Sequence, residues 1–258
     1  MFLISYLPLY NFILKLFGYK TNNKEETIYF DLETTGLNPY HNKIIEYAFI
    51  CEEHEVDNIE TTDNMRDKIN ETNYMNSSED IDNEYSNDNY ITSLVNPETK
   101  FDRKITNITN IHPDQLEDKP TIDKCLLDIT HFINYDSDKY SKTSYLVAHN
   151  CDSFDKIFLK NAITNYQDTT NTELDTQNWK YIDTVLFAKK LYPNLFSYSL
   201  KNLSTLFKIK DGNHRALNDA KCLQKVYHNL LLKLTNKIDK TYDSLIENPS
   251  IVYDYIYN

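Results

Sequence analysis

One short segment combines the pattern of a β-strand with two acidic side chains. Apolar residues occupy every second position, at Ile28, Phe30 and Leu32, which is the period of a half-buried strand. Side chains two residues apart share a face, so Asp31 and Glu33 project together from the opposite face. Two carboxylates this close repel unless a cation lies between them, and such hard oxygen ligands suit Mg²⁺ or Mn²⁺. Alone, such a pair is more often a solvated strand face than a catalytic one.

A second motif, which contains the acid Asp155, follows an apolar run that ends at His149 and Asn150. A helix is expected over residues 153–163, with Asp152 or Ser153 suited to cap its N-terminus. Asp155 is then expected about one turn into this helix.

A third pattern, residues 212–220, places His214 in a loop and Asp219 near the start of a helix expected over residues 215–233. The helix carries an apolar face typical of a helix packed on a sheet. An acid in a first helical turn usually complements the helix dipole, and a lone histidine before a helix is usually structural.

Together, the three patterns strongly resemble the DnaQ-like (DEDDh) family of 3′–5′ exonucleases within the ribonuclease H-like superfamily. They occur in the order of the family and with its rough spacing, over about residues 26–232. The matching motifs are Asp31-x-Glu33-Thr34-Thr35-Gly36-Leu37, then His149-Asn150-x-x-Phe154-Asp155, then His214-Arg215-Ala216-Leu217-x-Asp219-Ala220.

The resemblance implies a site for two Mg²⁺ (or Mn²⁺) ions and a two-metal hydrolysis of the 3′-terminal phosphodiester bond, which releases a nucleoside 5′-monophosphate. It implies that His214 is the general base that takes the proton of the attacking water. The implied metal ligands are Asp31, Glu33, Asp155 and Asp219.

Contacts to the substrate follow from the same resemblance. The segment Thr34, Thr35, Gly36 and Leu37 is expected to line the pocket of the terminal nucleotide, with Leu37 against its base. Asn150 and Phe154 are expected to shape this pocket, although helix-to-sheet core packing is the stronger alternative for Phe154. Arg215 is a candidate for a phosphate contact. Asp183 is expected to cap a helix instead of serving the site.

Glycine and cysteine usage excludes other classes of site. The chain has only three glycines and no phosphate-cradling glycine loop, which excludes Rossmann and P-loop chemistry. Its four cysteines show no C-x-x-C spacing, which argues against structural zinc and indicates a reducing, intracellular compartment, cytoplasmic or nuclear.

Charge is distributed unevenly along the 258 residues, whose formal net charge is −12. Residues 52–90 carry 13 acidic and two basic side chains and few apolar ones, a composition that predicts a disordered insertion. We expect an apolar extension at 1–25, an exonuclease domain at 26–235 and a tail at 236–258. The extension lacks the features of a signal peptide and is shorter than the ~20 residues of a membrane span.

The alternation of patterns predicts an α/β fold with a mixed five-stranded sheet flanked by helices, and the resemblance implies that this fold is ribonuclease H-like. The acids, one pair on the first strand and two on later helices, should converge at one edge of that sheet. Strands are expected at 27–33, 43–51, 91–96, 144–148 and near 180–182, and helices at 121–134, 153–163, 183–191, 198–207 and 215–233.

Three functions remain open from the sequence. The leading hypothesis is a metal-dependent exonuclease acting at 3′ ends of DNA, single-stranded or frayed, with a polymerase among the protein partners considered. The alternatives are an RNA-trimming exonuclease of the same family and a non-catalytic scaffold that binds nucleic acid or a polymerase. Membrane association is not expected, and the sequence predicts no oligomeric state.

Overall fold

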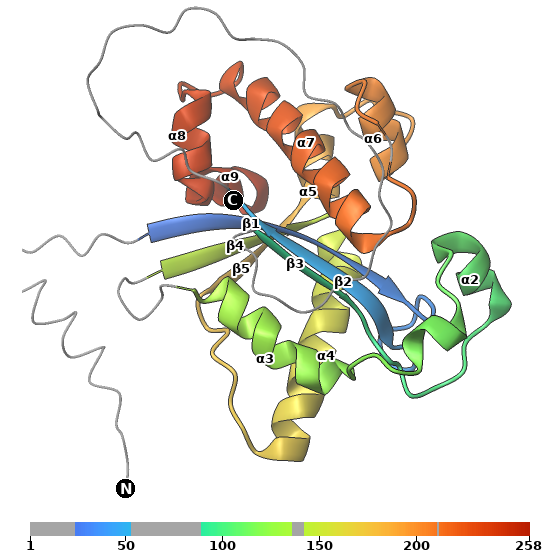
Figure 1. The fold of residues 1–258 in the computed structure, drawn as a ribbon. Helices are drawn as coiled ribbons and strands as arrows, with labels where there is room; N and C mark the ends of the chain where they lie inside the picture. Colours follow the sequence, from blue (N-terminus) through green and yellow to red (C-terminus); the bar gives the residue numbers. More distant parts are fainter. Residues whose placement is uncertain (1–23, 53–88, 136–141, 211) are drawn as a thin grey trace, which may run out of the picture.

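The computed structural model describes residues 24–52, 89–135, 142–210 and 212–258. Nearly all of the predicted apolar extension (1–25) and of the predicted acidic insertion (52–90) therefore lies outside the described residues. The described parts form a twisted sheet covered by helices on both faces (Figure 1).

The sheet has five strands in the order β3-β2-β1-β4-β5. The first three strands form an antiparallel meander, and β4 and β5 then add in parallel on the other side of β1. This confirms the predicted mixed five-stranded sheet and places β1 at its centre. The strands are β1 (Lys24–Thr34), β2 (Ile44–Cys51), β3 (Tyr90–Leu94), β4 (Lys142–Ala148) and β5 (Trp179–Asp183).

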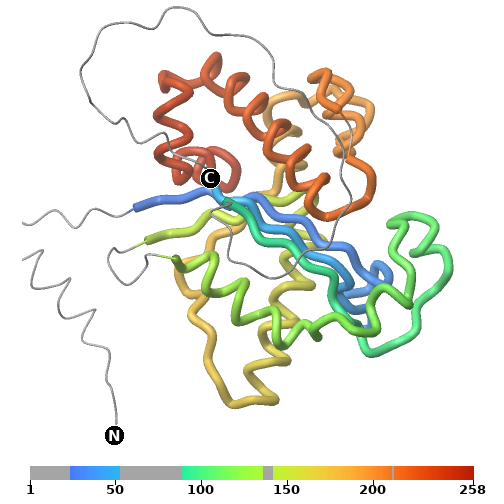
Figure 2. The backbone as a smooth tube through the Cα atoms, viewed as in Figure 1, coloured from blue at the N-terminus to red at the C-terminus, as the bar shows by residue number. Residues whose placement is uncertain are grey.

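Each face of the sheet has its own apolar core, because side chains alternate along every strand. On one face, Phe30 and Leu146 pack beneath α3 (Ile122–Ile133) and α4 (Asp155–Thr170). On the other, Tyr29 and Val147 pack beneath helices α5 to α9. The tube in Figure 2 shows these two layers of helices on either side of the strands. The second layer comprises α5 (Thr184–Leu191), α6 (Leu200–Leu206), α7 (Ala216–Thr235), α8 (Tyr242–Glu247) and α9 (Pro249–Tyr257).

The helix boundaries differ from the expected ones in two places that matter for the site. A short 3₁₀ turn, η2 (Cys151–Ser153), precedes α4, so α4 begins at Asp155 and runs to Thr170 instead of covering 153–163. Asp155 is the first residue of the helix, not one turn into it. Asp152 is not the helix cap, because Phe154 occupies that position and the Asp152 side chain bonds Lys156.

Two further regions are more ordered than the sequence suggested. Residues 103–109 form α2 (Arg103–Thr109), which is followed by the turn η1 (Pro113–Leu116). The segment expected to be a tail provides α8 and α9, and their Leu245, Val252 and Ile256 are buried in the core beside α7. None of the described helices combines the length and apolar character that crossing a bilayer requires.

Candidate active site

The end of the central strand β1 carries the first pair of acids. Ile28, Phe30 and Leu32 point into the core beneath α3 and α4, so Asp31 and Glu33 point to the opposite face of the strand, as predicted. Glu33 lies opposite Glu46 of β2, and the register shifts immediately after it, between Glu33 and Thr34. This irregularity precedes the last pair of the ladder, Thr34 with Ile44, just beyond the two carboxylates.

Asp155 reaches the same place from the N-terminus of α4. Its Oδ1 accepts a hydrogen bond from the backbone N–H of Leu32, between the two acids of β1, at 3.2 Å. Asp155 is 3 % exposed, so this bond ties the buried start of α4 to the end of β1. A carboxylate at a helix N-terminus is also favoured by the helix dipole.

The third group comes from α7 and the loop before it. One possible ligand atom each from Glu33, His214 and Asp219 lies within 4.8 Å of the others. His214 has the left-handed backbone conformation, with φ of 54°, while Asp219 lies in the first turn of α7. The structure thus brings together the strand and loop side chains that the sequence separates by about 180 residues.

Gly212 makes room for this arrangement. A Cβ atom on Gly212 would lie 1.4 Å from Oδ1 of Asp219, so any side chain there would displace that carboxylate. Glycine is needed at this position because only a residue without a side chain lets the loop approach Asp219 this closely. The position of Gly212 in the sequence, beside the third motif, gave no sign of this role.

The pKa values of Asp31, Glu33 and Asp155 are raised because these side chains are buried and several carboxylates lie close together. Burial, followed by the charges of Asp155 and Glu33, raises the pKa of Asp31 well above its usual value. Burial and the charges of Asp219 and Glu46 raise the pKa of Glu33 to about 8. Burial raises the pKa of Asp155 to about 7, against the backbone N–H bonds that favour its charged form. These shifts indicate negative charge that an added cation would neutralise.

The donor set fits a hard divalent cation. It consists of carboxylate oxygens and one imidazole, with no thiolate among the grouped side chains. The sequence predicted four metal ligands and one general base. Of these five residues, Glu33, His214 and Asp219 have possible ligand atoms within 4.8 Å of one another. Asp31 and Asp155 adjoin this group, and each interacts electrostatically with the other. The assignment of these residues as metal ligands and base stays a prediction.

The sequence model of a family described as "Exonuclease" (RNase_T) matches residues 79–227, more than half of the chain. The chain belongs to this exonuclease family. The matched residues contain Asp155, His214 and Asp219, whereas Asp31 and Glu33 precede them. The structure joins the two parts, because β1 lies beside β2 and β4 and in contact with α7.

Curated relatives of this exonuclease chain are much longer proteins. It is 26% identical over 223 residues to the "DNA polymerase III PolC-type" of Clostridium perfringens, covering 86% of this chain and 12% of that protein. It is 30% identical over 228 residues to the protein of the same name from Thermotoga maritima, covering 87% of this chain and 13% of that protein. The chain therefore spans roughly an eighth of the length of these relatives.

Solved structures share the fold. Exonuclease I of E. coli in complex with a dT13 oligonucleotide superimposes with a TM-score of 0.55 and 14% identity, covering 90% of this chain and 43% of that chain. Exonuclease I of Methylocaldum szegediense gives a TM-score of 0.51 at 15% identity, covering 80% of this chain and 40% of that chain.

The predicted substrate contacts of the exonuclease site differ in how they are placed. Leu37 is 84% exposed just beyond β1, free to contact a ligand. Gly36 packs against Asn42, and the Thr34 and Thr35 hydroxyls bond neighbouring backbone, so these residues shape the β1–β2 connection. Their substrate contacts remain predictions.

Two further predicted contacts, Asn150 and Phe154, lie just before α4. Asn150 is exposed, with a left-handed backbone, just before η2. The Phe154 ring lies against that of Phe158 at an angle of 53°, with ring centroids 4.8 Å apart, and packs against the core, which supports the alternative of core packing for it. Asp183 caps α5 by accepting a bond from the Val185 N–H at 2.8 Å, as predicted.

Sequence reasoning missed the partner of Arg215. Its guanidinium forms a bidentate ion pair with Glu46 of β2, with an Nη2–Oε1 distance of 2.7 Å. The second oxygen of Glu46 accepts the N–H of Ala216 at 2.9 Å. Glu46 therefore fixes the start of α7 between His214 and Asp219. The spacing of 169 residues between Arg215 and Glu46 left no local signal for this contact.

Proposed function

We propose that this exonuclease-family domain is a metal-dependent 3′–5′ exonuclease that hydrolyses the terminal phosphodiester bond of DNA. The observation that carries the proposal is the convergence of Glu33, His214 and Asp219 beside Asp31 and Asp155 at the end of β1. A catalytically silent scaffold has no chemical need for such an arrangement, whose uncompensated charge destabilises the fold.

DNA is the proposed polymer because the curated relatives that match most of this chain are DNA polymerases by name. A domain that shares the sequence of a small part of such polymerases fits a task at the end of a DNA strand. We propose single-stranded or frayed 3′ ends as the substrate and a polymerase as a candidate partner.

In this mechanism Asp31, Glu33, Asp155 and Asp219 would hold two divalent cations. When bound, the cations supply Lewis-acid activation of the attacking water and neutralise charge on the departing 3′-oxygen. His214 accepts the proton of the water on a ring nitrogen, and its exposed position on the loop before α7 keeps it accessible to solvent. Exposed Leu37 contacts the terminal base.

Incubation with matched 5′-labelled single-stranded DNA and RNA oligonucleotides tests the proposal, in Mg²⁺, in Mn²⁺ and in chelator. A metal-dependent ladder that shortens from the 3′ end of DNA supports it. Asp31→Ala should abolish the ladder because it removes a proposed metal ligand, whereas Asp168→Asn, an exposed acid on α4, should leave the ladder unchanged.

Each other outcome has a definite meaning. A stronger ladder on RNA would replace the DNA assignment with the RNA-trimming alternative. Near-normal cleavage by Asp31→Ala would overturn the assignment of the metal site. Absence of cleavage by a folded wild-type protein that binds the metal would favour the scaffold.

A further inference from the structure

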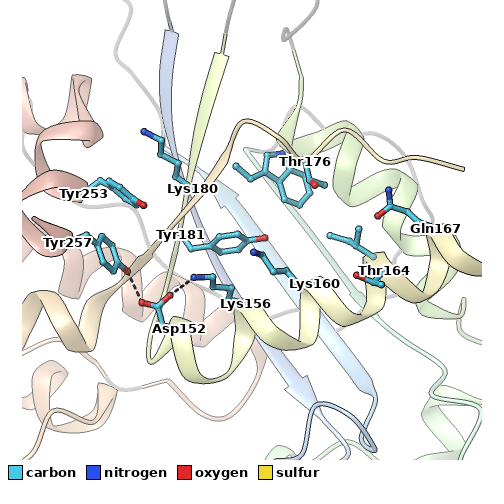
Figure 3. A pocket seen from close by; sticks show the side chains of 12 residues that line it. Asp152, Lys156, Lys160, Thr164, Gln167, Thr176, Lys180, Tyr181, Tyr253 and Tyr257 are labelled. Carbon is cyan, nitrogen blue, oxygen red and sulfur yellow. Dashed lines mark hydrogen bonds and ion pairs between the residues drawn. The ribbon is translucent and has the colours of Figure 1, made fainter.

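A groove of about 740 Å³ follows the free edge of the sheet, along β5 (Figure 3). One wall is the flank of α4, with Lys156 and Lys160, and the other is α9, with Tyr253 and Tyr257. Figure 3 shows the ring of Tyr181 on its floor, between these two walls. No predicted site residue lines this groove.

The groove is positively charged. Lys156, Lys160 and Lys180 all line it, whereas Asp152 is the only acid among its described lining residues. Asp152 is already paired with Lys156 at 2.7 Å. Within the described part of the chain, Lys160 and Lys180 form no ion pair, and both are exposed. Two uncompensated cations therefore face the groove.

Aromatic rings hold these ammonium groups in place. The Nζ atoms of Lys156 and Lys160 lie 5.4 and 5.5 Å from the centroid of the Tyr181 ring. Lys180 lies 5.0 Å from the centroid of Tyr253. Cation–π contacts of this kind reduce the freedom of lysine side chains, so less entropy is lost when they bind an anion. Lys160 lies one helical turn beyond the paired Lys156, about 6 Å along the axis, and so extends the positive charge along this wall.

The edge of β5 is less suited to an added peptide strand. The backbone N–H of Asp183 already donates to the hydroxyl of Tyr257 at 3.1 Å, and that of Trp179 donates to the carbonyl of Thr176 at 3.1 Å. Pairing with a peptide would require these donors. A ligand recognised through its negative charge needs none of them, which favours a phosphodiester backbone over a peptide.

One end of the groove lies at η2, the turn that leads directly into α4 and Asp155. Asp152, at one end of it, lies three residues before Asp155, and the Asp152 N–H donates to Asp183 at the end of β5. We propose that this groove binds the backbone of the single strand on the 5′ side of the nucleotide being removed. The inference rests on the proposed exonuclease function and adds a second contact region that includes α9, an element beyond the matched residues 79–227.

The test compares the double variant Lys160→Gln/Lys180→Gln with a control, Lys225→Gln/Lys240→Gln, which alters two exposed lysines on or just after α7. Fluorescence anisotropy with labelled dT20 in chelator measures binding without cleavage. The groove variant should raise the Kd about 5- to 10-fold and lower the slope of log Kd against log salt by about 1.4, which is ~0.7 for each lost phosphate contact. The control variant should change neither the Kd nor this slope. Lys160→Arg/Lys180→Arg, which keeps both positive charges, should retain the wild-type slope.

Cleavage distinguishes this inference from the proposed function. In Mg²⁺, the groove variant should raise KM for dT20 while leaving kcat and the cleavage of dT4 unchanged. Equal losses on dT4 and dT20 would overturn the groove, because the lysines would then support the catalytic site or the fold. Equal binding by the groove and control variants would overturn it as well. If wild type cleaves neither oligonucleotide, the exonuclease proposal fails while the anisotropy comparison still decides the groove.

Discussion

Removing the charge of Glu33 should stabilise the metal-free protein while impairing the site. Burial and the neighbouring charges of Asp219, Glu46 and Asp155 raise the pKa of Glu33 to about 8. A raised carboxyl pKa means that the folded state favours the protonated form. The stability from Glu33 is therefore fully present below its ordinary pKa near 4.5 and is lost as the pH rises through 8. Glutamine keeps the shape of the protonated side chain and does not ionise.

The size of this effect follows from the shift. At pH 8 the shift corresponds to an upper bound of about 4 kcal/mol, since one pKa unit is about 1.4 kcal/mol. Glu33 is partly exposed and shares the repulsion with its neighbours, so we expect Glu33→Gln to raise the free energy of unfolding by about 1–2 kcal/mol. For a domain of this size that is a rise in Tm of roughly 2–8 °C.

Thermal unfolding in chelator at pH 8 and pH 5 measures the difference. The stabilisation should be present at pH 8 and fall to a small fraction of that value at pH 5, close to the ordinary pKa near 4.5. Added Mg²⁺ should raise the Tm of wild type more than that of Glu33→Gln, because the ion neutralises the charge that the variant lacks. Glu173→Gln, which alters an exposed glutamate, serves as the control. A variant no more stable than wild type at pH 8 would refute the repulsion argument.

Three further predictions address the residues around this cluster. Gly212→Ala should weaken Mg²⁺ binding and cleavage at least 10-fold with the fold retained, because its Cβ would meet Oδ1 of Asp219. Titration calorimetry measures the Mg²⁺ affinity and circular dichroism checks the fold. Unchanged Mg²⁺ affinity would contradict the close approach of Gly212 to Asp219. Glu46→Gln should lower kcat about 10-fold because it loosens the start of α7. Arg215→Lys should lower kcat less, since the hydrogen bond from the Ala216 N–H to Glu46 remains. Equal losses of kcat would mean that the guanidinium of Arg215, and not Glu46, positions the start of α7. His214→Ala should cost about 10²–10⁴-fold in kcat with metal affinity kept, the usual contribution of a general base, and loss of metal affinity would instead make His214 a ligand or support.

Local patterns predicted the sheet, and the resemblance of the motifs to the exonuclease family supplied the expectation that the acids meet. The alternation around Asp31 and Glu33 specified both the strand and the face of its carboxylates. The apolar stripes of the later helices placed Asp155 and Asp219 on elements that pack on that strand. Such patterns act over a few residues, where side-chain periodicity dominates the structure.

Contacts between distant residues could not be predicted in this way. The start of α4 at Asp155 depends on η2 and on the unusual backbone of Phe154, with φ −136° and ψ −86°, neither of which has a simple residue code. The pairing of Arg215 with Glu46 depends on tertiary packing between α7 and β2. The helix α9 carries Tyr253, Tyr255 and Tyr257, so its amphipathic pattern was obscured by side chains that are apolar and polar at once.

The way in which the chain holds its acids together links stability to function. Asp155 is held by the backbone N–H of Leu32, and Arg215, a cation close to the cluster, forms its bidentate pair with Glu46. Arg215 lowers the pKa of Glu33, but burial and the other acids outweigh it. The described side chains thus leave the cluster with excess negative charge. An arrangement that supplied its own neutralising cations would be more stable and would have less need of metal. Because this one does not, binding of divalent cations should contribute to folding and to catalysis through the same carboxylates.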